Sequence, residues 1–338
     1  MQQSAPSISV VICNFNYEKF IARAVDSALE QSYQAKEIIV VDDGSTDRSW
    51  EILQNYQGRV TLIHQKNGGQ AAAYNRGMDP VSGDFVLFLD SDDCLDKDCL
   101  EVLAQRLTPD IARAHWRLRL VDHDGNQTGG YIPRILFNGT ADHRLLSKGV
   151  MPPASPGSGN VYNTRLLKSV MPLPLDAIDR HAADFFTIRA STWLGRILAI
   201  EDRPLGCYRI DTAREAESLI FGNADKRRAC PYQNRIDRFK AWMGGRRPDL
   251  AALLPSDDID FSMQKQSYAA SIFDASNYFQ GVSAAMALWP SLLKSIRYYQ
   301  GGMIAKFVLA LWSVVIMLMP RRLGLPIAGY VCNPARRN

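Results

Sequence analysis

Three acidic side chains crowd the end of one apolar segment, because Asp90, Asp92 and Asp93 follow the run FVLFL. Like charges this close repel one another unless a cation neutralises them. Carboxylate oxygens suit Mg²⁺ or Mn²⁺, ions that commonly share their coordination shell with substrate phosphates. Turn formation explains one aspartate at such a position and explains three poorly. The cluster therefore predicts a binding site for Mg²⁺ or Mn²⁺.

A second acidic pair, Asp42 and Asp43, closes the apolar run EIIVV and precedes Gly44. A carboxylate at such a position can accept hydrogen bonds from ribose hydroxyls or from a base N–H. Aspartate is equally common in turns and at helix N-termini. Both interpretations of the pair stay open at this point.

The segments that must position these acids alternate between strand and helix patterns. Residues 8–13, 37–41, 60–65 and 84–89 are apolar, β-branched runs, typical of strands buried on both faces, and helical spacing lies between them. This alternation predicts an α/β fold with a doubly wound, mostly parallel sheet. Ligands bind such sheets beyond the carboxyl ends of the strands, so the polar residues there should face one crevice.

The ordered motifs SVVICNFNYEKF, EIIVVDDGSTDRS, NGGQAAAYNRGM and GDFVLFLDSDD closely resemble family 2 glycosyltransferases, which have the GT-A fold. The resemblance implies an inverting enzyme whose catalytic domain spans residues 1–215 and whose donor is a nucleotide-diphosphate sugar, UDP-sugar in first place. It implies that Asp42 or Asp43 contacts the base and ribose. It makes Asp90–Ser91–Asp92 the DxD element, with Asp90 and Asp92 as metal ligands. It also implies further donor-site residues: Asn14, Asn16, Asn67, Gly69, Asn75, Arg76 and Ser91. The family often has Arg-Asn where this chain has Tyr74–Asn75, so Arg76 is equally well a surface arginine.

Transfer to a hydroxyl also needs a carboxylate that takes the proton of the acceptor. By resemblance this base stands at the start of a helix, and the segment DRHAADFFTIRASTWLG offers Asp184. Ala183 stands where the family commonly has Glu, and Asp176 and Asp179 are alternatives. An aspartate in the first turn of a helix is also favoured by the helix dipole alone.

Two loop segments extend the resemblance. Gly157 and Gly159 in PPASPGSGN lack side chains that would keep an acceptor sugar away from the backbone, although an ordinary glycine-proline loop has the same composition. Downstream, Arg209 and Asp211 could contact metal or phosphate, with an exposed loop as the default interpretation.

The C-terminal third predicts a helical cap over residues 216–300 and a membrane-associated segment over 301–338. Residues 307–319 are apolar except for Ser313, and the cations Lys294, Arg297, Lys306, Arg321 and Arg322 flank them. This pattern favours a helix in the cytoplasmic leaflet, attached peripherally or monotopically, and a lipid-linked sugar or other glycan as acceptor. A membrane-spanning helix and a buried core helix are the alternatives.

Composition excludes several classes. A net charge of only +4 gives no footprint for nucleic acid. The lack of GxGxxG after the first strand disfavours a dehydrogenase, and NFNYEKF replaces the glycine-rich loop of sugar nucleotidyltransferases. A non-catalytic scaffold that binds nucleotide sugars stays possible. The six cysteines form no CxxC pair, which predicts reduced thiols in a cytoplasmic protein.

Overall fold

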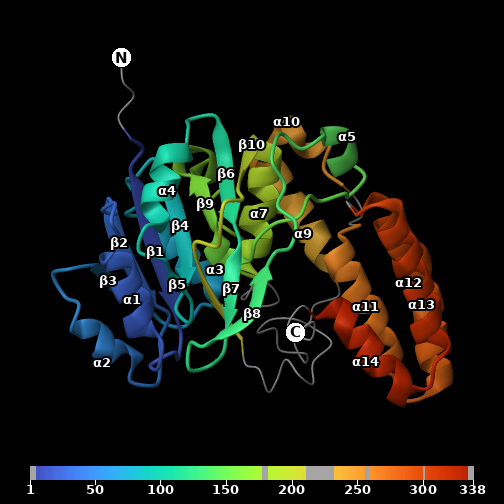
Figure 1. The fold of residues 1–338 in the computed structure, drawn as a ribbon. Coiled ribbons are helices and arrows are strands. Elements are labelled where there is room, and N and C mark those ends of the chain that lie inside the picture. The colour runs from blue at the N-terminus through green and yellow to red at the C-terminus, as the bar shows by residue number, and fades with distance from the viewer. Residues whose placement is uncertain (1–4, 177–181, 211–231, 256–258, 300, 334–338) are drawn as a thin grey trace.

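The computed structural model describes residues 5–176, 182–210, 232–255, 259–299 and 301–333. An α/β unit holds the first two thirds of the chain, and a group of long helices lies beside it (Figure 1). The predicted α/β architecture with a helical extension is confirmed. The expected boundary near residue 215 falls outside the described residues.

The central sheet has seven strands in the order β10-β6-β9-β4-β1-β2-β3. Only β9 runs antiparallel to its neighbours β4 and β6, so the sheet is mixed and mostly parallel, as predicted. The strands are β1 (Ile8–Asn14), β2 (Glu37–Asp42), β3 (Thr61–His64), β4 (Phe85–Asp90), β6 (Ile111–Trp116), β9 (Asn160–Asn163) and β10 (Arg196–Ile200).

Helices cover both faces of this sheet, which explains why β1, β2 and β4 are almost wholly apolar. The edge strand β3 is only partly buried, so the expectation of burial on both faces is wrong for it. Ile8, Val10 and Ile12 of β1 pack into the core beneath α1 and α4, whereas Val11 packs into the core that includes α3 and α7. The helices of this unit are α1 (Ile21–Leu29), α2 (Ser49–Gln54), α3 (Gln70–Met78), α4 (Cys99–Arg106), α5 (His143–Leu146), η1 (Gly157–Gly159), α6 (Thr164–Lys168) and α7 (Ala183–Leu194).

A smaller sheet has the order β5-β11-β7-β8, formed by β5 (Cys94–Leu95), β11 (Gly206–Arg209), β7 (Leu118–Val121) and β8 (Gln127–Ile132). Cys94 and Cys207 are direct partners in the antiparallel pair of β5 and β11, and their sulfurs form a disulfide. The prediction of reduced thiols is therefore wrong for these two residues. They lie 113 residues apart in the chain, and only the pairing of the two strands brings them together.

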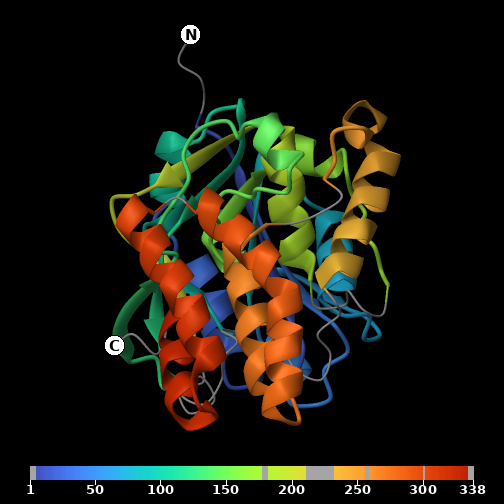
Figure 2. The same cartoon turned by 90° about the vertical axis from the view of Figure 1, so that its right-hand side faces the viewer.

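The C-terminal part is helical. α9 (Tyr232–Arg246) packs against α7, with Phe239 and Trp242 beside Phe186, and α10 (Pro248–Ala251) packs against α9. α11 (Phe261–Phe273), α12 (Tyr278–Tyr298), α13 (Met303–Leu318) and α14 (Arg321–Cys332) share a core of their own. α12 and α13 form the outer layer of this group, on the side away from the sheet (Figures 1 and 2). None of the described helices is long and apolar enough to cross a membrane.

Candidate active site

The carboxyl ends of β1, β2 and β4 lie side by side, since Asn14 pairs with Asp42 and Cys13 pairs with Asp90. Asp42 is fully buried and accepts hydrogen bonds from Asn14 Nδ2 at 2.8 Å and from the Ser45 N–H at 3.1 Å. Its Oδ2, which accepts the Ser45 N–H, also lies 2.8 Å from His64 Nδ1 at the end of β3. Asp42 therefore ties three neighbouring strand ends together, and a contact with a nucleotide base or ribose stays a prediction.

Asp43 holds the start of α3. Its carboxylate accepts hydrogen bonds from the N–H groups of Gly68 and Gly69, at 2.8 and 2.7 Å, and from Gln65 Nε2 at 2.7 Å. Gly69 has φ of +90°, a conformation that residues with a β-carbon rarely adopt. The pair Asp42–Asp43 thus orders the strand ends and the turn before α3, the segment that the resemblance assigns to the donor.

The other predicted donor residues divide into two groups. Asn16, at φ +59°, accepts a hydrogen bond from the Thr46 N–H at 2.7 Å, beside the Asp42 turn. Asn75 instead exchanges two hydrogen bonds with the backbone of Leu173. Arg76 has a side chain that is 55% exposed and pairs with Asp79, so it lies on the protein surface, away from the strand ends. Ser91 is buried, and Asn67 lies in the loop that precedes α3.

Asp90 and Asp184 approach each other across Gly157. A β-carbon placed on Gly157 would lie 3.3 Å from Asp90 Oδ2, 3.5 Å from the Tyr74 hydroxyl and 3.8 Å from Asp184 Cβ. The helix α7 begins at Ala183, so Asp184 stands in its first turn, as the sequence predicts. The structure therefore unites the predicted DxD acid, the predicted base and one predicted acceptor glycine. Gly159 lies elsewhere and packs against Ser155 and the carbonyl of Trp116.

Burial makes it unfavourable for Asp90 and Asp184 both to be ionised. Burial, followed by the negative charges of Asp92 and Asp184, raises the pKa of Asp90 to about 7. Burial also raises the pKa of Asp184, against the lowering effect of the Phe185 N–H and of the charges on Arg235 and Arg189. A raised pKa suits a carboxylate that must take up a proton. The alternative base Asp176 is exposed, while Asp179 lies outside the described residues.

Gln70 connects strand β4, which carries Asp90, with helix α7, which carries Asp184. The sequence alone did not identify this residue. Its Nε2 donates to Asp90 Oδ1 at 3.2 Å, and its Oε1 accepts from the N–H of Ala183 at 3.3 Å. The only signal in the sequence is its place in NGGQAAAYNRG, a segment expected to line the donor pocket. Nothing there predicts contact with a helix that begins 113 residues later.

Arg209 stabilises the loop that contains Asp92 and Asp93. Its N–H donates to Asp93 Oδ1 and its Nε to the carbonyl of Asp92, both at 2.9 Å. The guanidinium also donates to the carbonyl of His123 at 2.8 Å and lies 4.5 Å from the centre of the Phe20 ring. Arg209 therefore fixes the backbone around the predicted metal ligands. Asp211 falls outside the described residues.

The residues at the site are suited to a cation that takes the rest of its coordination shell from a bound substrate. No cluster of three or more His, Cys, Asp or Glu side chains suited to a metal occurs among the described residues. Asp90 and Asp92 nonetheless supply oxygen donors whose mutual repulsion a cation would relieve. Mg²⁺ and Mn²⁺ are commonly held by one or two carboxylates together with substrate phosphates. The donor set thus matches a metal–diphosphate complex.

Comparison with known proteins identifies the fold and the family of the chain. A solved structure of residues 1–349 of TarS from Staphylococcus aureus, in complex with UDP-GlcNAc, shares the fold, with a TM-score of 0.54 at 16% identity over 98% of this chain and 92% of that fragment. The sequence profile of glycosyl transferase family 2 matches residues 9–129. An uncharacterized glycosyltransferase of Nostoc is 31% identical over 65% of this chain and 69% of its own length.

The fold is thus that of a GT-A-like α/β protein. The chain belongs to glycosyl transferase family 2 and is a glycosyltransferase. The poly(ribitol-phosphate) β-N-acetylglucosaminyltransferase TarS of S. aureus Mu50 is 29% identical over 62% of this chain, which covers 36% of that protein. A cholesterol galactosyltransferase of Borreliella burgdorferi is 37% identical over 30% of each chain.

Proposed function

We propose that this protein is an inverting glycosyltransferase that moves a sugar from a nucleotide-diphosphate donor, a UDP-sugar, to a hydroxyl of a glycan or lipid-linked acceptor. The approach of Asp90 and Asp184 across Gly157 carries the proposal. In this proposal Asp90 acts beside the donor phosphates, and Asp184 acts beside the acceptor hydroxyl. The similarity to TarS, whose structure holds UDP-GlcNAc, supports the choice of UDP.

In the reaction, the acceptor oxygen forms a bond to the anomeric carbon from the face opposite the leaving group. The bond between that carbon and the diphosphate oxygen breaks, and the nucleoside diphosphate leaves with the electron pair. Asp184 takes the proton of the acceptor hydroxyl, and its raised pKa favours this transfer. Asp90 and Asp92 would hold Mg²⁺ or Mn²⁺, which supplies charge neutralisation at the leaving diphosphate.

The side chains around these acids keep the geometry. Asp43 holds the Gly68–Gly69 turn at the donor pocket, and Gln70 connects Asp90 with the start of α7. Such positioning matters because small displacements of reacting groups strongly reduce rates. We therefore regard Asp43 and Gln70 as positioning residues and Asp184 as the catalytic base.

The substitution Asp184→Asn tests the assignment of the base. We expect transfer to fall about 10²- to 10⁴-fold, the range for losing a general base, with donor affinity nearly unchanged. Asp176→Asn, at the exposed alternative position, should transfer at the wild-type rate. Undiminished transfer by the Asp184 variant would remove it as the base. If wild-type protein bound UDP-sugars yet transferred none across a panel of donors and membrane-extract acceptors, a non-catalytic scaffold would replace the proposal.

We also propose that the protein attaches peripherally to the cytoplasmic face of the membrane through its C-terminal segment, where it meets a lipid-linked acceptor. The apolar composition of α13 and its flanking cations support this placement. Removal of the residues after Gln300 should release the protein from membranes, and membrane binding that survives the truncation would contradict the proposal.

A further inference from the structure

One side of α13 is an exposed apolar face. Its side chains are between 53% and 83% exposed and lie on one side of the helix, with Leu318 two turns beyond the others: Met303, Ile304, Phe307, Val308, Leu311 and Leu318. The opposite side of the helix packs into the helical core through Trp312, Ser313 and Ile316. Contiguous exposed apolar surface of this kind marks a contact with a membrane or another protein.

The exposed surface continues at the C-terminal end of α13. There the α11–α12 turn meets the α13–α14 turn, and Tyr278 Oη donates to the carbonyl of Met317 at 3.4 Å. Phe279 beside one turn is 82% exposed, and Leu323 beside the other is 61% exposed. Because α12 and α13 form the outer layer of the molecule, this surface is open to a large flat partner (Figures 1 and 2).

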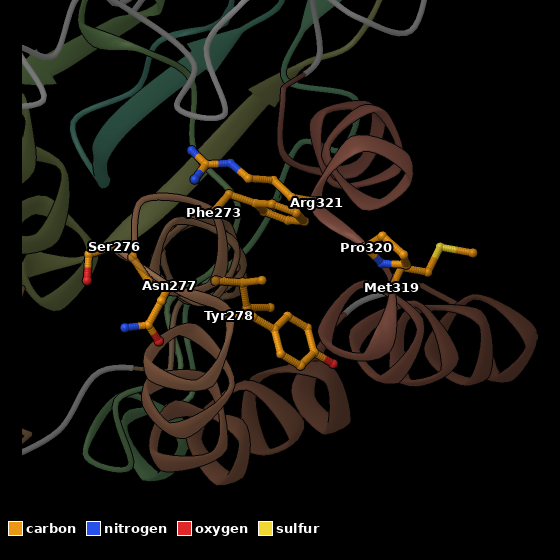
Figure 3. A pocket seen from close by; sticks show the side chains of 9 residues that line it. Phe273, Ser276, Asn277, Tyr278, Met319, Pro320 and Arg321 are labelled. Carbon is orange, nitrogen blue, oxygen red and sulfur yellow. The ribbon is translucent and has the colours of Figure 1, made fainter.

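A pocket of about 410 Å³ lies between the two turns (Figure 3). Its walls are mostly apolar, formed by Ile272, Phe273, Met319 and Pro320, and Ser276 and Asn277 also line it. Arg321 lies at its edge. An apolar cavity with a cation at its rim suits a molecule that joins a hydrocarbon chain to an anionic group.

The net charge of the C-terminal region indicates which kind of partner this surface binds. Residues 275–338 contain seven Lys and Arg and no Asp or Glu, although the whole chain has a net charge of only +4. The preceding residues are therefore net negative, and the C-terminal region alone is strongly cationic. Clusters of Lys and Arg beside an interfacial helix are attracted to anionic lipid headgroups.

We propose that the apolar face of α13 docks into one leaflet of a membrane rich in anionic phospholipid. In this position α13 lies in the plane of the leaflet, because its inner side stays packed on the other helices. The pocket between the turns takes a lipid hydrocarbon chain, with the lipid phosphate at Arg321. This inference deepens the proposed membrane attachment by naming its surface and its lipid class, and it does not depend on the transfer reaction.

Co-sedimentation of the full-length protein with vesicles tests the proposal without donor or acceptor. We expect binding to vesicles of phosphatidylglycerol and phosphatidylcholine that weakens at least tenfold on pure phosphatidylcholine or in high salt. The double substitution Ile304→Asp/Phe307→Asp should reduce binding at least tenfold. Leu175→Asp, at a 61% exposed leucine of the α/β unit, should bind as the wild type does. Arg321→Gln should reduce the preference for phosphatidylglycerol.

Three results would overturn the proposal. The double variant could bind vesicles as well as the wild type. The wild type could fail to sediment with either kind of vesicle. Sedimentation equilibrium could also show a wild-type dimer that the double variant loses, without vesicle binding, which would assign the face to a second copy of the chain. Since glycosyl transfer to a water-soluble acceptor is measured separately, failure of the catalytic proposal would leave these outcomes unchanged.

Discussion

Replacement of Gln70 tests whether a residue that takes no part in the reaction positions the carboxylates that do. Its side chain makes one hydrogen bond to the Asp90 carboxylate at 3.2 Å and one to the Ala183 N–H at 3.3 Å. A hydrogen bond to a charged group contributes about 1.5–3 kcal/mol, and both distances are at the long end of the normal range. We take the lower figure, so Gln70→Ala should reduce kcat/KM for the donor about tenfold.

The variant Gln70→Glu separates the two bonds. A glutamate oxygen can still accept from the Ala183 N–H, but its carboxylate faces Asp90 without a proton to donate. Two negative charges about 4 Å apart repel by about 4 kcal/mol at an effective dielectric constant of 20. We therefore expect Gln70→Glu to raise the KM for the donor more than Gln70→Ala does, and to lower kcat less.

The assay is steady-state release of nucleoside diphosphate with varied donor and saturating acceptor. Gln31 provides a matched control, because it also bridges two segments, with Nε2 donating to the carbonyls of Ser27 and Asp96 and Oε1 accepting from the Leu100 N–H. Gln31→Ala should destabilise the protein and leave kcat and KM unchanged. Wild-type kcat and KM in both Gln70 variants would refute the positioning role.

Three further predictions concern a buried histidine, two glycines and the disulfide. His115 is buried, which lowers its pKa to about 3. Between about pH 6.5 and pH 3 only the unfolded chain takes up a proton at this residue, so the free energy of unfolding should fall by about 1.4 kcal/mol for each pH unit. Urea titrations of the wild type and of His115→Gln should differ by that slope. Gly157→Ala should lower kcat/KM with little change in Tm, whereas Gly159→Ala, with a β-carbon 2.7 Å from a neighbouring side chain, should lower Tm, and equal effects on both measures would count against the acceptor assignment of Gly157. Reduction of the Cys94–Cys207 disulfide should lower the free energy of unfolding by about 2–4 kcal/mol, and chemical denaturation that is unaffected by dithiothreitol would contradict this.

Local patterns predicted four of the strands of the central sheet, β1 to β4, and the ends of these strands. The runs that became β1, β2 and β4 are buried on both faces, and their apolar character ends where the polar residues Asn14, Asp42 and Asp90 begin. Parallel pairing then brings these three residues to one edge. This part of the candidate site follows from composition and topology rules alone.

Contacts between distant segments could not be predicted in the same way. The insertion of β9 between β4 and β6 brings Gly157 to Asp90, and no periodicity specifies which strand fills that place. The bond between Gln70 and the N–H of Ala183 depends on the same arrangement. Helix α13 illustrates a further gap, because its sequence is apolar on all sides and only packing distinguishes its buried Ile316 from its exposed face.

The aspartates of the acidic cluster differ in their contacts and therefore in their expected roles. Asp93 is buried, accepts a hydrogen bond from the Arg209 N–H, and has a pKa raised well above its ordinary value by burial and by Asp92. A carboxyl that accepts this hydrogen bond stabilises the loop. The excess of three aspartates, which argued for a cation at the outset, thus reduces to Asp90 and Asp92. Two carboxylates are enough for a cation whose remaining ligands come from a diphosphate, and they are too few for a metal held by the protein alone.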